Sequence, residues 1–233
     1  MNARVALIIA AVVTLVLPSV PIVGALLRPF VWLQTFCHEL GHGVAALVCG
    51  AQSIAISVYV DASGLTHNGA TSHAWSAGEQ GFVAMAGLVG PACASALFFV
   101  SARGAKRARV LLAVFALLLL ACAAVVVDNA FGQVVVGAWG LAIALAAWRA
   151  PPQIACAFVG IDLGLSVFSR GDYLFAKTAH TGGGTFPSDV ENVASSWGGV
   201  ALFWGLAIGA FSVALVLLGL FIALRGSSQT ARR

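Results

Sequence analysis

The sequence contains very few charged residues. Only 9% of its 233 residues are Asp, Glu, Lys or Arg, whereas 61% are hydrophobic. Soluble domains average about 25% charged and about 45–50% apolar residues, so this chain has too few charges to cover a soluble fold. The mean hydropathy of +1.00 agrees with this. The composition therefore excludes a cytosolic globular enzyme and a disordered chain.

Cysteine is also scarce, which excludes a disulfide-stabilised scaffold. The five cysteines lie mostly inside apolar runs, and an odd number in such places does not form a disulfide framework. We expect them to be small buried hydrophobic residues. The net charge of +4 comes from basic residues between apolar segments. This placement predicts contact with anionic lipid rather than with nucleic acid.

Apolar segments of the length needed to cross a bilayer recur along the chain. They predict an all-α, polytopic membrane protein with about six or seven transmembrane helices. Residues 1–233 are expected to form a single membrane-embedded domain. The segments lie at 5–27, 29–50, 82–101, 110–127, 131–148, 153–170 and 198–224.

The distribution of Lys and Arg predicts the orientation of these segments. The densest basic cluster, 101–109, is placed in the cytoplasm. The loop 51–81 has no Lys or Arg and is placed outside, together with 171–197. Arg4 then falls outside if 5–27 crosses the membrane once. That segment therefore either spans with the N-terminus outside or forms a re-entrant hairpin, and both possibilities stay open.

Two loop segments have a recognisable local pattern. Residues 53–60 alternate, a turn signal follows at 61–64, and a return strand can begin at Leu65, so a short β-hairpin is expected at 53–68. An exposed edge of 53–60 could hold an extended peptide by backbone pairing. The three glycines at 182–184 predict a flexible linker.

The sharpest motif is His38-Glu39-Leu40-Gly41-His42, in the middle of the apolar segment 29–50. Helical residues i and i+4 share a face, so both imidazoles can bind one Zn²⁺. Glu39 stands beside them, where it can take a proton from an activated water. An unpaired carboxylate at this depth costs at least about 2.5–3.5 kcal/mol. The alternative is a polar cluster that packs one helix against another.

The octapeptide Phe36–Gly43 in its apolar helix resembles the site-2 protease family of intramembrane zinc metallopeptidases. Residues 61–66, 86–91 and 188–194 resemble the compact bacterial branch of that family. The resemblance implies a Zn²⁺ held by two histidines, His38 and His42, and a catalytic base, Glu39. It also implies a multi-pass protein of the bacterial inner membrane that hydrolyses peptide bonds of membrane-protein segments.

The third metal ligand in this family is usually an Asp from a Leu-Asp-Gly motif, which this sequence lacks. Helix depth favours Asp162. It lies nine residues into its segment, about 14 Å, which is the depth of His38 in its own segment. Asp172 and Asp189 are placed at or beyond the outer end of the membrane, and both stay alternatives.

These features predict an intramembrane zinc metallopeptidase in which Glu39 is the general base. A catalytically silent, zinc-binding membrane scaffold of the same family is the main alternative. The missing Leu-Asp-Gly motif favours it and the intact Glu39 opposes it. A metal-ion transporter is a further alternative, but it would need ionisable groups stepped along a path. The expected partners are lipid and a membrane-protein substrate.

Overall fold

The protein is mostly helical in its computed structural model, which describes residues 21–169 and 175–230. Four of the seven helices in these ranges, α3, α4, α5 and α9, are long and apolar enough to cross a membrane, and α6 is a shorter apolar helix. The predicted all-α membrane fold is confirmed, while most of segment 5–27 lies outside the described residues. The helices are α2 (Pro21–Val48), α3 (Ala77–Ser101), α4 (Ala105–Val125), α5 (Ala130–Arg149), α6 (Pro152–Ser169), α8 (Asp189–Trp197) and α9 (Ala201–Thr230).

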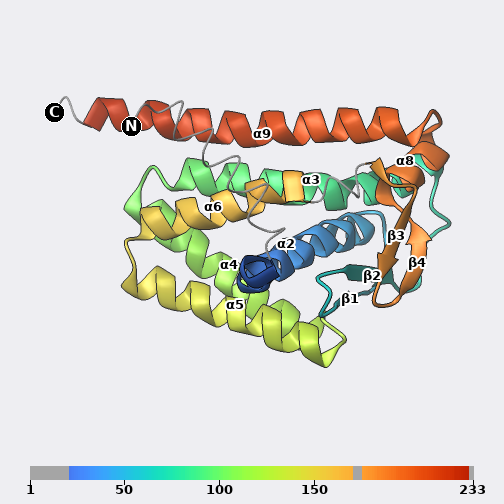
Figure 1. Ribbon diagram of the computed structural model, residues 1–233, viewed down its shortest axis with the longest axis horizontal. Helices are drawn as coiled ribbons and strands as arrows, with labels where there is room; N and C mark the ends of the chain where they lie inside the picture. The colour runs from blue at the N-terminus through green and yellow to red at the C-terminus, as the bar shows by residue number, and fades with distance from the viewer. Residues whose placement is uncertain (1–20, 170–174, 231–233) are drawn as a thin grey trace.

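The helix α3 is the centre of the arrangement, since it contacts α2, α6, α8 and α9, while α4 packs against α5. The α3–α4 and α5–α6 turns lie at one end of the molecule, and α8 lies with the β-strands at the other (Figure 1). The basic cluster 101–109 is therefore at the opposite end from the described parts of loops 51–81 and 171–197. This agrees with the predicted sidedness of these loops.

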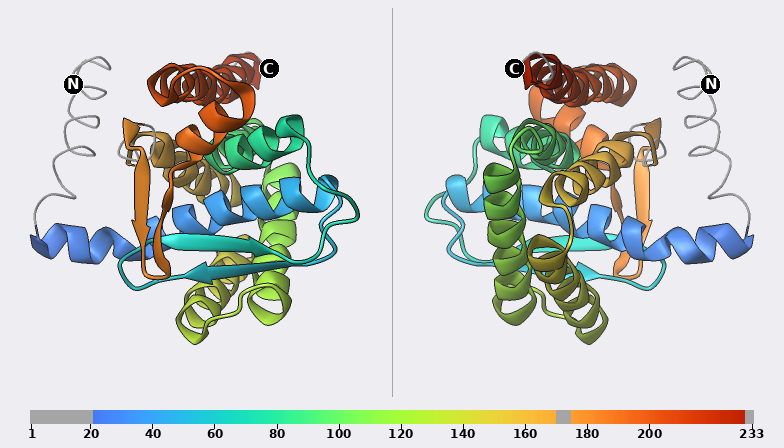
Figure 2. Two further views of the ribbon diagram at one scale, coloured as in Figure 1. Left: turned by 90° about the vertical axis from the view of Figure 1, so that its right-hand side faces the viewer. Right: turned by 90° about the vertical axis from the view of Figure 1, so that its left-hand side faces the viewer.

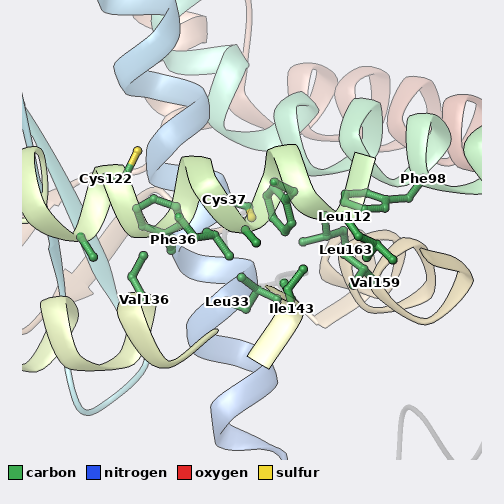
Figure 3. Close-up of a cluster of buried hydrophobic side chains, with 14 of the residues drawn as sticks. Leu33, Phe36, Cys37, Phe98, Leu112, Cys122, Val136, Ile143, Val159 and Leu163 are labelled. Atoms are coloured by element: carbon green, nitrogen blue, oxygen red, sulfur yellow. The ribbon is translucent and has the colours of Figure 1, made fainter. Parts of the chain in front are cut away.

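The main hydrophobic core surrounds α2, which passes between the other helices (Figure 3). All five cysteines are free, and four of them are buried, in keeping with the prediction. The core joins five helices through Leu33, Phe36 and Cys37 of α2, Phe98 of α3, Leu112 and Cys122 of α4, Val136 and Ile143 of α5, and Val159 and Leu163 of α6.

The predicted β-hairpin is confirmed. Strands β1 (Ile54–Val58) and β2 (Gly64–Asn68) pair antiparallel. The carboxylate of Asp61 accepts a backbone hydrogen bond inside the turn, and Ala62 adopts a φ of 67°. The hydroxyl of Thr35 on α2 donates to the Ala62 carbonyl at 2.7 Å, so the turn is fixed to the central helix.

The outer edge of β1 is covered, so the prediction of an exposed edge at 53–60 is wrong. The Ile56 N–H donates to the Val126 carbonyl at 2.9 Å, and the Asp128 N–H donates to the Ile56 carbonyl at 3.1 Å. The side-chain amide of Asn129 bonds to both the N–H and the carbonyl of Val58. The loop between α4 and α5 therefore occupies this edge, and the other strand, β2, forms the free edge of the hairpin.

A second hairpin replaces the predicted flexible linker at 182–184. Strands β3 (Thr178–Thr181) and β4 (Gly184–Pro187) pair antiparallel, with the first two glycines as a two-residue turn. The Gly182 N–H at its tip donates to the Ser63 hydroxyl at 2.9 Å, so the tip rests on the turn of the first hairpin. Figure 2 shows the two hairpins crossing at this point.

The helices α2 and α3 approach each other closely where Gly41 of α2 meets the backbone of α3. A Cβ atom on Gly41 would lie 2.5 Å from the Ala86 carbonyl oxygen, and only a backbone shift could relieve that overlap. The small residue therefore sets the distance between the helix that carries the His-Glu motif and its main neighbour.

We expect Gly41→Ala to lower the thermal unfolding midpoint, because overpacking a helix contact typically costs about 1–3 kcal/mol. The matched control is Gly137→Ala on α5, where the added Cβ would lie 3.9 Å from Ala123 Cβ, an ordinary contact. That variant should be neutral or slightly stabilising, since Ala favours a helix interior over Gly by about 0.5–1 kcal/mol. Thermal melts of both purified variants in detergent test this, and equal midpoints would contradict the close approach.

Candidate metal centre and its cleft

The two histidines of the motif point to a common position from successive turns of α2. Their Nε2 atoms lie 3.1 Å apart. The Nδ1 atom of His42 is 2.7 Å from the Val83 carbonyl on α3, so a neutral His42 donates its Nδ1–H there. This bond fixes the ring and leaves the Nε2 lone pair free to bind a metal, as is usual for metal-binding histidines.

A carboxylate from a distant part of the chain completes this group. Asp189 is the first residue of α8, and the Ser188 hydroxyl caps that helix by accepting from the Glu191 N–H. The Asp189 carboxylate oxygens lie 3.0 Å from His38 Nε2 and 3.4 Å from His42 Nε2. Burial opposes ionisation here, but the adjacent imidazoles outweigh it and hold the pKa of Asp189 well below its usual range.

The three donors fit a zinc ion. Ligand atoms at 2.0–2.1 Å from a tetrahedral Zn²⁺ are about 3.3 Å apart. The two Nε2 atoms are 3.1 Å apart, Asp189 Oδ2 lies 3.0 Å from His38 Nε2, and Asp189 Oδ1 lies 3.4 Å from His42 Nε2. Two imidazoles and one carboxylate are also a ligand set that catalytic zinc sites use, with the fourth position left for water or substrate. Among the described residues, His38, His42 and Asp189 are the group of three metal-ligating side chains that converges in this way.

Glu39 is held beside this group by the free-edge strand β2. The Thr66 hydroxyl lies 2.8 Å from Glu39 Oε2 and 2.9 Å from the Glu39 carbonyl oxygen, within donating distance of both. A Cβ on Gly64 would lie 2.6 Å from Glu39 Cγ, so only glycine lets the strand pass this close to the carboxyl side chain. The strand therefore restricts the positions that the Glu39 carboxylate can take.

These four side chains share one cleft of about 350 Å³. Its walls come from α2, β2 and α3, from the β3–β4 hairpin, and from α8. The residues of β2 that line it are Gly64, Leu65, Thr66 and Asn68. The cleft thus brings two histidines and two carboxylates together with an open strand edge.

Asp162, the predicted third ligand, does not join this group. Its carboxylate accepts a 2.8 Å hydrogen bond from Gln34 Nε2, one turn before His38 on α2. The depth argument assumed that the helix begins near residue 29, whereas α2 already includes Pro21. Asp162 meets α2 at Gln34, which precedes His38 by four residues, or about 6 Å along the helix axis. Asp189 replaces it as the candidate third ligand, while the other alternative, Asp172, lies outside the described residues.

One sequence pattern could have predicted that Asp189 stands at the start of a helix. The pattern Ser188-x-x-Glu191 is typical of a helix N-terminus, and it indicates that a new helix begins at 189. That helix folds back over α3 because Val190 and Val193 are fully buried against Ala84, Leu88 and Ile208. No local sequence pattern predicts the hydrogen bond between Thr66 and Glu39, because the contact of β2 with α2 depends on tertiary packing.

Comparison with known proteins identifies the family of the chain. The family described as Peptidase M50B-like matches residues 5–219, which is most of the chain. A search of curated proteins and a search of solved structures each gave no significant match. With its membrane-spanning helices and its family match, the chain belongs to the Peptidase M50B-like, site-2 protease-like family of membrane metallopeptidases.

Proposed function

We propose that this protein is an active intramembrane zinc metallopeptidase that cleaves membrane-protein segments in the bacterial inner membrane. The observation that carries the proposal is the convergence of His38, His42 and Asp189 at zinc-like separations, in the same cleft as Glu39. Family membership supports the reaction class. The surrounding apolar helices support a substrate that is itself a membrane segment.

The proposed mechanism assigns one role to each side chain. His38, His42 and Asp189 would hold Zn²⁺, which when bound supplies a Lewis acid and lowers the pKa of water. Glu39 accepts the proton of the attacking water and delivers it to the leaving amine. The Thr66 hydroxyl bonds to Glu39 Oε2 and so positions the base before and after the proton transfer.

The free edge of β2 is the proposed binding site for the substrate backbone. The hydrogen bond from the Tyr59 N–H to the Ser63 carbonyl sets the register of the hairpin, and such bonds alternate along an antiparallel pair. Gly64, Thr66 and Asn68 therefore direct their N–H and carbonyl groups away from β1. These three residues line the cleft, so an extended segment paired with them would pass beside Glu39.

The silent-scaffold alternative has less support than the sequence alone gave it. The main argument for a silent scaffold was the missing Leu-Asp-Gly motif, which would supply the third ligand. Asp189 offers a carboxylate beside the two histidines instead. His38, His42 and Asp189 converge at one point, whereas a transporter would need such groups stepped along a path.

Zinc content distinguishes the two candidate acids. We expect Asp189→Asn to weaken zinc binding by about tenfold or more, because a neutral amide is a poor replacement for a carboxylate ligand. Double replacement of His38 and His42 by Ala should remove the zinc. Asp162→Asn is the matched control and should keep it. Metal analysis and chelator competition measure this, and zinc loss in the Asp162 variant alone would restore that residue as the ligand.

Catalysis can be separated from zinc binding. Glu39→Gln should keep its zinc and lose about 100-fold or more in cleavage rate, since Gln cannot accept a proton. Thr66→Val should lose about tenfold, because hydrogen bonds to charged groups contribute about 1.5–3 kcal/mol, and Thr66→Ser should restore the rate. Single-turnover cleavage of a reporter membrane segment measures these rates. A zinc-loaded wild-type protein that cleaves no membrane segment would support the silent scaffold instead.

The strand-edge proposal predicts a selective effect at Asn68. Asn68→Pro removes an N–H that points away from β1, so it should raise KM about fivefold, the value of one net hydrogen bond. Zinc content and kcat should stay close to wild type. Asn68→Ala keeps the N–H and serves as the control. Equal KM values for the two variants would show that the β2 edge does not bind the substrate backbone.

A further inference from the structure

A second, larger cavity lies outside the cleft, in a groove formed by α2, α3 and α4. It has a volume of about 520 Å³, and no charged or amide side chain lines it. None of its lining residues lines the cleft. Several of them are strongly exposed, including Val44 of α2 (51%), Leu97 of α3 (54%) and Val114 of α4 (58%). The groove is therefore an open apolar channel on the membrane-facing side of these helices.

This groove opens at one end into a basic recess. A cavity of about 370 Å³ at the α3–α4 turn is lined by Ser101, Lys106 and Arg107, together with apolar residues of α4. Leu111 and Val114 line both cavities, so the apolar groove and the basic recess adjoin. A ligand that fits both parts must have one charged end and one long apolar part.

The charge of the recess is not balanced by the protein. Arg103 and Arg109 add to the two lining cations, and no acidic residue occurs between Glu79 and Asp128. Within residues 21–169 and 175–230, no ion pair involves any of these four cations. The turn joins two helices that can each cross the membrane, so its cations lie at the level of the lipid headgroups.

We propose that this composite groove binds an anionic phospholipid. Lys106 and Arg107 bind the headgroup phosphate, and one acyl chain lies along Leu111 and Val114 between α3 and α4. The stretch of α3 beside the groove, 82–101, is about 28 Å long, close to the hydrocarbon thickness of a bilayer. An extended chain therefore has room, and it would contact α2 at Leu40 and Val44, which also line the groove.

Lipid retention tests this proposal. The full chain is extracted from nanodiscs of equimolar phosphatidylglycerol and phosphatidylcholine, and the bound lipids are counted by native mass spectrometry. Wild type should retain phosphatidylglycerol in preference. Combined Lys106→Gln and Arg107→Gln should lower this preference about fivefold for each charge removed. The matched control removes two charges at the same end of the molecule, through Arg149→Gln and Arg225→Gln, and should keep the preference.

Two further experiments distinguish the binding of a phospholipid from the binding of a free phosphate ion. Val114→Trp fills the apolar groove without changing the charge and should also lose the bound lipid. Excess inorganic phosphate should leave the lipid on wild type, because phosphate cannot replace the acyl chain. The proposal is overturned if wild type retains both lipids equally, or if the control loses as much as the Lys106/Arg107 variant. It is also overturned if phosphate displaces the lipid while Val114→Trp retains it, which would indicate an anion site only. Val114→Trp and single Lys106→Gln still test the site if the double variant does not fold.

Discussion

The meeting of Asp189 with His38 and His42 is the interaction on which the arrangement around the cleft depends. Ionisable side chains are expensive to bury among apolar helices unless each has a partner. Here a carboxylate from α8 lies 3.0–3.4 Å from two imidazoles of α2. The Ser188 cap and the buried apolar face of α8 hold that carboxylate in place, so the polar centre and the packing of the C-terminal region require each other.

The hairpin β1–β2 is the second support of the centre. The α4–α5 loop covers the edge of β1 with backbone hydrogen bonds, so β2 forms the open edge of this hairpin. Residues of β2 line the cleft. Thr35 connects the turn of the hairpin to α2 one helical turn before Glu39, and Thr66 connects β2 to Glu39 itself. A rigid helix and a rigid strand thus hold the proposed base between them, which is the kind of support that a precise proton transfer requires.

Local sequence patterns suffice to predict some features of this protein and not others. The helical membrane fold and the hairpin at 53–68 depend on residues close together in sequence, and both were predicted correctly. Asp162 was expected to reach the metal because its depth was counted from an assumed helix start. An error of one turn shifts a side chain by about 5.4 Å, far more than a metal ligand allows. The covered edge of β1 and the hydrogen bond of Thr66 arise from long-range packing, which no local pattern encodes.

Asp189 is synthesised much later than His38 and His42, and this order has a consequence for the nascent chain. The two histidines are synthesised and inserted early, whereas the carboxylate follows only after α3, α4, α5 and α6. A nascent chain that ends before α8 therefore contains both imidazoles and Glu39 but no third ligand from that helix. In the proposed enzyme, the hydrolytic centre is completed only when nearly the whole chain has entered the membrane. Unfinished copies would then be unable to attack neighbouring proteins at the site of insertion.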